Sequence, residues 1–138
     1  EEALRPFEPP EAARPIETVR IRPGDHRWTV IRDLAHGEAV LEVLKDDGIR
    51  RIPEIDWAHG RYAYERYSVT GEDLRTLRGE TVRRKTFQRK AWRVSTETRT
   101  VLAATKDTFI IRADVDAFEG DHRIFCYTWD ERIPRDHV

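Results

Sequence analysis

Strict alternation of apolar and polar side chains near the C-terminus is the feature that most limits how this chain can fold. One set alternates along residues 109–117 and is apolar: Phe109, Ile111, Ala113, Val115 and Ala117. The intervening set is mostly polar: Ile110, Arg112, Asp114, Asp116 and Phe118. Successive side chains of a strand point to opposite faces, so this pattern predicts an antiparallel strand with one buried and one solvated face. Helical periodicity never extends beyond about two turns in this chain.

Further runs rich in β-branched and aromatic residues are separated by clusters of Gly, Asp and Lys, which are typical of turns. Strands are expected at 28–33, 38–45, 49–55, 61–69, 80–88, 91–104 and 122–131. The sequence Asp46-Asp47-Gly48 predicts a hairpin, because Asp-Gly favours the positive φ that a tight turn requires. Another turn is expected at 58–60 and an irregular stretch at 71–77. The fold class is therefore all-β, an antiparallel β-sandwich of jelly-roll type, complete or partial, with closure into a barrel as the alternative.

The chain divides into a proline-rich arm or linker at 1–17 and a single β-sandwich domain at 18–138. Four prolines mark the arm: Pro6, Pro9, Pro10 and Pro15. Proline fixes φ and cannot donate to a ladder, so the arm is expected to be extended. The sequence holds no methionine, even at position 1, which indicates a fragment, a processed product or an engineered chain.

Charge and cysteine content narrow the classes of function. The 25 Lys and Arg residues nearly cancel the 26 Asp and Glu residues, which argues against a nucleic-acid partner. The basic run Arg83-Arg84-Lys85 has no interleaved aromatics, so we interpret it as a charged strand face. A single cysteine, Cys126, excludes an intramolecular disulfide and fits a reducing cytoplasm. No apolar run reaches the ~20 residues of a membrane span, so no membrane partner is expected.

No catalytic residue is expected in this chain. Its only serines, Ser68 and Ser95, lie outside any Gly-x-Ser-x-Gly elbow. Cys126 lies between two aromatic residues, where a small buried hydrophobic side chain is expected rather than a reactive thiol. The paired carboxylates Asp114 and Asp116 alternate with apolar residues and are expected on a solvated face.

The histidines do not predict a metal site, and no cofactor is expected. The five are His26, His36, His59, His122 and His137. No two have the i, i+2 or i, i+4 spacing that directs both rings at one ion from a strand or helix. Solvated loop positions are expected, with a metal site built from distant loops as the alternative.

Aromatic residues leave two interpretations open. The chain has four tryptophans, Trp28, Trp57, Trp92 and Trp129, and three tyrosines between 62 and 67. Each tryptophan can bury a large area, so core positions are expected. The alternative is that some line a surface that binds a sugar or a partner.

Three segments, 28–43, 92–100 and 117–136, resemble the C-terminal end of the CocE/NonD hydrolases, relatives of X-Pro dipeptidyl-peptidase and cocaine esterase. The proline stretch at 6–10 resembles the sequence that precedes the first of these motifs. The resemblance implies a non-catalytic jelly-roll domain of an acyl esterase or dipeptidyl-peptidase. Such a domain packs on an α/β-hydrolase domain that carries a Ser-Asp-His triad, and it helps to wall the active site. No triad position has a counterpart here, so no catalytic residue is carried over.

The chain is shorter than the jelly roll of that family and lacks its earlier strands. A partial sandwich leaves unpaired strand edges, which predicts closure as a barrel, self-association or strands supplied from elsewhere. The first expectation is an accessory domain whose partner is an α/β-hydrolase catalytic domain, in cis or in trans, with a homo-oligomer as a further partner. The alternative is a free-standing barrel or sandwich that binds a small apolar or sugar ligand through its aromatics. An enzyme that uses loop histidines ranks below both.

Overall fold

The computed structural model describes residues 12–136, and nearly all of them are in β-strands. The strands are β1 (Val19–Arg22), β2 (Asp25–Asp33), β3 (Glu38–Ile52), β4 (Trp57–Thr70), β5 (Asp73–Arg89), β6 (Trp92–Ala104), β7 (Thr108–Glu119) and β8 (His122–Pro134). One short 3-10 turn, η1 (Pro53–Ile55), joins β3 to β4. The predicted all-β antiparallel class is confirmed. Residues 12–18 have no regular structure, and the rest of the predicted arm lies outside the described residues.

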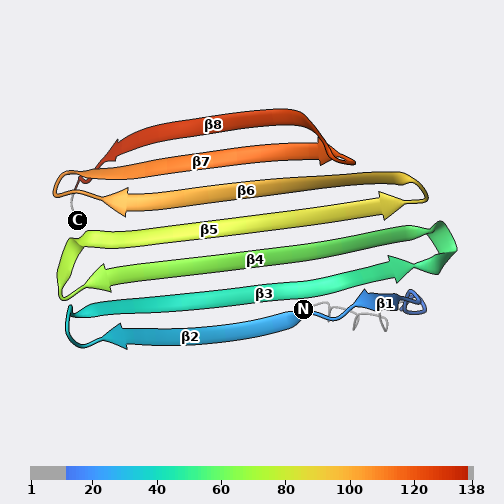
Figure 1. Cartoon of the computed structure of the whole chain (residues 1–138), viewed down its shortest axis with the longest axis horizontal. Coiled ribbons are helices and arrows are strands. Elements are labelled where there is room, and N and C mark those ends of the chain that lie inside the picture. Colours follow the sequence, from blue (N-terminus) through green and yellow to red (C-terminus); the bar gives the residue numbers. More distant parts are fainter. Residues whose placement is uncertain (1–11, 137–138) are drawn as a thin grey trace, which may run out of the picture.

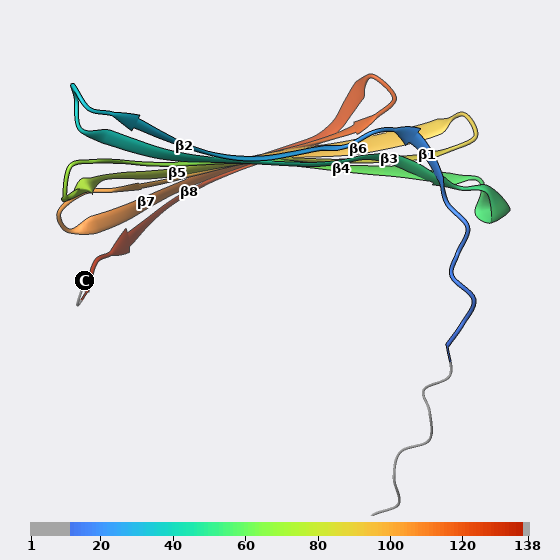
Figure 2. The same ribbon diagram turned by 90° about the horizontal axis from the view of Figure 1, so that it is seen from below.

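All eight strands belong to one antiparallel sheet. From β3 to β8, each strand pairs with the next along the chain, which gives the simple meander in Figure 1. At one edge, β1 and β2 both pair with β3, on successive parts of its length. Seen from the side in Figure 2, the strands form a single twisted layer.

The sheet is open, so the alternative of a closed barrel is wrong. In the part of the chain that the structure describes, β8 pairs only with β7 and β2 only with β3. Closure would require these two edges to pair with each other, and no such pairing is present within residues 12–136. A single open sheet is compatible with one layer of a sandwich, and the described residues supply no second layer.

The predicted hairpin at Asp46-Asp47-Gly48 is wrong, because β3 continues through these residues. A β-bulge lies between Asp46 and Ile49, and Gly48 has a φ of 73°. The positive φ that Asp-Gly favours therefore serves a bulge rather than a turn. A Cβ atom on Gly48 would lie 2.2 Å from the carbonyl oxygen of Arg22, so the neighbouring edge strand also requires a glycine here.

Two other boundaries differ from the sequence prediction. Residues 58–60 lie within β4, and the chain reverses earlier, where Pro53 begins η1 and Asp56 takes the left-handed conformation at φ 50°. Proline at the first position of a 3-10 turn has a φ that suits it, which explains the early stop. Residues 73–77, expected to be irregular, belong to β5. The chain reverses between β2 and β3, between β6 and β7 and between β7 and β8, in gaps that the predicted strands leave between them.

Strand register divides the side chains into two faces of different chemistry. We call one the apolar face; its apolar residues are Trp28, Val30, Leu41, Val43, Tyr67, Val69, Leu102, Phe109, Ile111, Val115, Tyr127 and Trp129, and register also places Lys45, Glu65, Arg83 and Glu131 on it. We call the other the ionic face; its residues are Glu42, Tyr64, Arg66, Glu80, Arg84, Glu97, Arg99, Arg112, Asp114, Asp116 and Asp130. The alternation predicted at 109–118 is confirmed and extends across the neighbouring strands.

Few side chains are buried. The buried hydrophobic residues are Val40, Val43, Ala63, Val101 and Ala104. All are small, and among the described residues no large side chain is fully buried. A sheet normally buries one face against another layer, so this sheet relies on its backbone ladder far more than on a core.

The bidentate pair between Arg22 and Asp46 ties β1 to β3, with nitrogen–oxygen distances of 2.6 and 2.8 Å. The hydrogen bond from Arg22 is the main cause that lowers the pKa of Asp46. A lowered pKa means that the carboxylate stabilises the fold above the ordinary range of aspartate. This contribution is lost as the pH falls through the lowered value.

Asp46→Asn is therefore expected to lower the free energy of unfolding by about 1 kcal/mol at neutral pH, since Arg22 is half exposed and solvent screens the pair. Urea unfolding across the acid range measures this, and the difference from wild type should shrink as the pH falls below the ordinary range of aspartate. Asp25→Asn is the matched control, because Asp25 lies opposite Asp46 but pairs only with the exposed Arg27. A pH-independent difference would contradict the assignment.

Candidate functional site: an apolar sheet face and a basic cleft

The ionic face satisfies its own charges across neighbouring strands. Arg99 bonds Glu80 at 2.8 Å, and Arg84 bonds Glu97 at 2.8 Å. The hydroxyl of Tyr64 donates to Glu42 at 2.8 Å, which raises the pKa of that tyrosine. Each exposed pair contributes little to stability. Together they give a face that is complete in water and has no need of a partner.

The apolar face carries large side chains that nothing among the described residues covers. Those at least partly exposed include Trp28, Val30, Leu41, Tyr67, Trp92, Tyr127, Trp129 and Ile133. Trp28 is 77% exposed. The core positions expected for the tryptophans are therefore wrong for Trp28, Trp92 and Trp129, because a single layer leaves this face open. Contiguous apolar patches of this kind mark interaction surfaces.

Two aromatic clusters lie on the apolar face. The rings of Trp57 and Phe87 are 5.5 Å apart, and Trp92 lies 6.3 Å from Trp57. On the edge strand β8, Tyr127 and Trp129 meet edge to face at 4.6 Å. Such pairs rigidify the surface and offer large, well-ordered contact area to a partner.

An apolar hollow of about 440 Å³ lies on the same face, over β2 to β6. Its apolar lining includes Val30, Leu41, Val69, Leu77 and Leu102. The ring of Tyr67 lies beside Gly79, where a Cβ atom would be 3.4 Å from the ring. None of the tryptophans lines this hollow.

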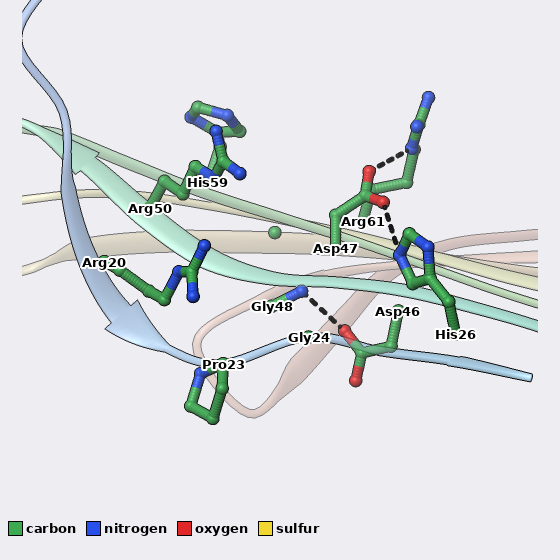
Figure 3. A pocket seen from close by; sticks show the side chains of 11 residues that line it. Arg20, Pro23, Gly24, His26, Asp46, Asp47, Gly48, Arg50, His59 and Arg61 are labelled. Atoms are coloured by element: carbon green, nitrogen blue, oxygen red, sulfur yellow. Dashed lines mark hydrogen bonds and ion pairs between the residues drawn. The ribbon is translucent and has the colours of Figure 1, made fainter.

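A second, basic cleft lies where β1 and β2 meet β3 and β4. It has a volume of about 520 Å³, and Figure 3 shows its lining. Register places Arg20 of β1 directly opposite Arg50 of β3, and Arg50 opposite His59 of β4. The side chains of these three residues lie on one side of the cleft in Figure 3, away from the pair formed by Asp47 and His26.

The carboxylates of the basic cleft are already engaged. Asp46 accepts from Arg22 and from the backbone N–H of Gly48, the latter at 2.8 Å. Asp47 accepts from Arg61 at 2.7 Å and lies 3.3 Å from the ring of His26. Within residues 12–136, neither Arg20 nor Arg50 has a carboxylate partner.

The structure separates most of the histidines. His36 bonds Asp33 at 2.7 Å in a turn, and His122 begins β8. His26 and His59, which the sequence treats as unrelated loop residues, both lie in strands and both line the basic cleft. His137 lies outside the described residues. Over 12–136, no group of three or more His, Cys, Asp or Glu side chains lies close enough to hold a metal ion.

The candidate nucleophiles and carboxylates lie on the ionic side of the sheet. Ser68 and Ser95 are in β4 and β6. Asp114 accepts from Thr128 at 2.8 Å, and Asp116 pairs with Arg123 at 3.2 Å. These partners match a solvated face.

Cys126 is exposed, so the expectation of a buried thiol is wrong. It lies opposite Asp116 on β8, the outer edge of the sheet. Flanking aromatic residues suggested an apolar environment, but they point to the opposite face.

In the basic run, Arg83 pairs with Glu65 at 3.3 Å and Arg84 pairs with Glu97. Register directs Arg83 and Arg84 to opposite faces of β5, so the interpretation of the run as one charged strand face is wrong, although each of these side chains has a carboxylate partner.

Comparisons with protein-family models, with curated proteins and with solved structures found no match for this chain. Among the described residues there is no helix long and apolar enough to cross a membrane.

Trp28 and Val43 test how open the apolar face is, because they lie opposite each other in register but differ in burial. Trp28→Ala is expected to change the free energy of unfolding by less than about 0.5 kcal/mol, as for an exposed side chain. Val43→Ala is expected to cost about 1–2 kcal/mol, because Val43 is buried. Denaturant unfolding of the isolated chain measures both. A larger cost for Trp28→Ala would contradict an uncovered face.

Proposed function

We propose that this chain is an accessory, non-catalytic β-sheet domain of a serine hydrolase of the CocE/NonD type, an acyl esterase or X-Pro dipeptidyl-peptidase. Its apolar face docks against the rest of that enzyme, in cis or in trans, and supports the catalytic α/β-hydrolase domain. The single cysteine fits a cytoplasmic location for the enzyme.

The difference between the two faces carries the accessory role. The ionic face completes its own ion pairs, as between Arg99 and Glu80. The apolar face leaves Trp28, Tyr127 and Trp129 partly exposed. In a layered fold, a single sheet has one solvated polar face and one apolar face that a second layer covers. The two faces of this sheet match that arrangement.

The hydrolase part of the proposal has separate support. Segments 28–43, 92–100 and 117–136 resemble the C-terminal end of that family. The only serines, Ser68 and Ser95, lie outside any nucleophile elbow, as expected of a domain that leaves catalysis to another part of the enzyme.

Ile110 and Ile111 give a matched pair for testing the docking face. They are neighbours in β7, both half-buried, and they point to opposite faces. A catalytic domain of the family, prepared without its own C-terminal sheet, is mixed with the chain, and the mass of the complex is measured by light scattering. Ile111→Asp should abolish the complex, because it places a charge in a desolvated interface. Ile110→Asp should leave it intact.

Ester turnover supplies the second measurement. The chain alone is expected to release no product from a chromogenic ester. Addition of the chain should raise the stability or the turnover of the catalytic domain, and Ile111→Asp should remove that gain. Turnover by the purified chain that a serine-directed inhibitor blocks would contradict the proposal. Equal loss of the complex in both variants would contradict docking through the apolar face.

The apolar hollow favours a second candidate function, the binding of a small apolar or sugar ligand. The tryptophans expected to hold such a ligand do not line it. A ligand in this hollow should shift tryptophan fluorescence little and should lose affinity in Leu102→Asp but not in Trp129→Ala. A saturable shift that Trp129→Ala removes would instead favour binding through the tryptophans.

A further inference from the structure

We propose that the basic cleft binds a divalent oxyanion of the phosphate class, as inorganic phosphate or a small phosphomonoester. The residues assigned to hold it are Arg20, Arg50 and His59. This inference is independent of the accessory role, because it rests on a different part of the sheet and on different contacts.

Like charges lie next to each other along one row of the basic cleft. Arg20 and Arg50 are directly opposite across an antiparallel pair, and His59 continues the same row on β4. Like charges directly opposite each other on one face destabilise a sheet. An anion bound between the two arginines would replace this repulsion by attraction to both. Anion binding therefore explains why two arginines lie opposite each other here.

The basic cleft carries positive charge that no carboxylate of the described residues compensates. Asp46 is held by Arg22, and Asp47 by Arg61, so each carboxylate already has a guanidinium. Arg20 and Arg50 remain without a carboxylate among the described residues. Their two positive charges match a dianion better than a single carboxylate.

The shape of the cleft leaves room for an anion beside the arginines. Its lining includes Gly24, Gly48 and Gly60, all of which face closely approaching backbone. A Cβ atom on Gly24 would lie 2.2 Å from the carbonyl oxygen of Asp46, and one on Gly60 would lie 3.0 Å from that of Gly48. No side chain at these positions can fill the cleft, so about 520 Å³ stays open beside the arginines.

The chemistry of the donors fits a tetrahedral oxyanion. Each guanidinium offers a planar fork of N–H groups that can bind two oxygens at once, and the imidazole of His59 adds one more donor. A phosphomonoester presents three acceptor oxygens and nearly two negative charges at neutral pH. Two forks and one ring can therefore satisfy all three oxygens.

Isothermal titration of the chain with inorganic phosphate, at constant ionic strength set with chloride, tests the proposal. We expect saturable binding with a dissociation constant of about 1 mM or lower. Arg20→Gln and Arg50→Gln should each weaken binding about tenfold or more, since each removes a charged pair of hydrogen bonds. Arg132→Gln is the control for net charge, because Arg132 lies on β8, at the far edge of the sheet.

Two further titrations identify the ligand. Phenyl phosphate should bind as well as phosphate if the site takes phosphomonoesters, and more weakly if it takes only the free ion. Acetate should bind at least tenfold more weakly, because it carries one charge. Equal affinity for acetate, no saturable phosphate binding, or equal effects of the Arg50 and Arg132 variants would each overturn the proposal. None of these results depends on docking to a hydrolase, since no catalytic domain is present.

Discussion

Backbone hydrogen bonds between long antiparallel strands hold this chain together, because the sheet has almost no interior. β3, β4 and β5 are paired along most of their lengths, and the buried side chains, such as Val43 and Val101, are few and small. The ladder also decides the chemistry of the surface. A slip of one residue would move every side chain of a strand to the other face, so the register that holds the sheet also sorts its residues.

Because of this sorting, the two faces differ in whether they need to be covered by another layer. On the ionic face, cross-strand pairs such as Arg84 with Glu97 complete the charges locally. On the apolar face, Trp129 and Tyr127 contact each other but leave much of their surface to solvent. A layer of this kind reaches the stability of an ordinary domain only when something covers the apolar side. The proposed docking to another protein surface rests on this uncovered side.

The basic cleft depends on a local break in the same ladder. Pro23 and Gly24 separate β1 from β2 along the edge of the sheet. The bulge at Asp47-Gly48 on β3 lies opposite this break. The extra residues let Asp46 hold Arg22 and Asp47 hold Arg61, while the row from Arg20 to His59 stays open. An irregularity that would weaken a uniform sheet thus produces a concave site with excess positive charge.

The sequence by itself determined the strand class, most turns and the division of residues 109–118 between two faces, because these follow from local alternation and turn chemistry. It did not determine that Asp46-Asp47-Gly48 forms a bulge, since a positive φ at Gly48 suits a turn equally well. Nor did it place Trp28 in solvent or bring Arg20 opposite Arg50. Only the tertiary structure decided these points, because exposure and cross-strand contact depend on which strands pair and on whether a second layer covers them.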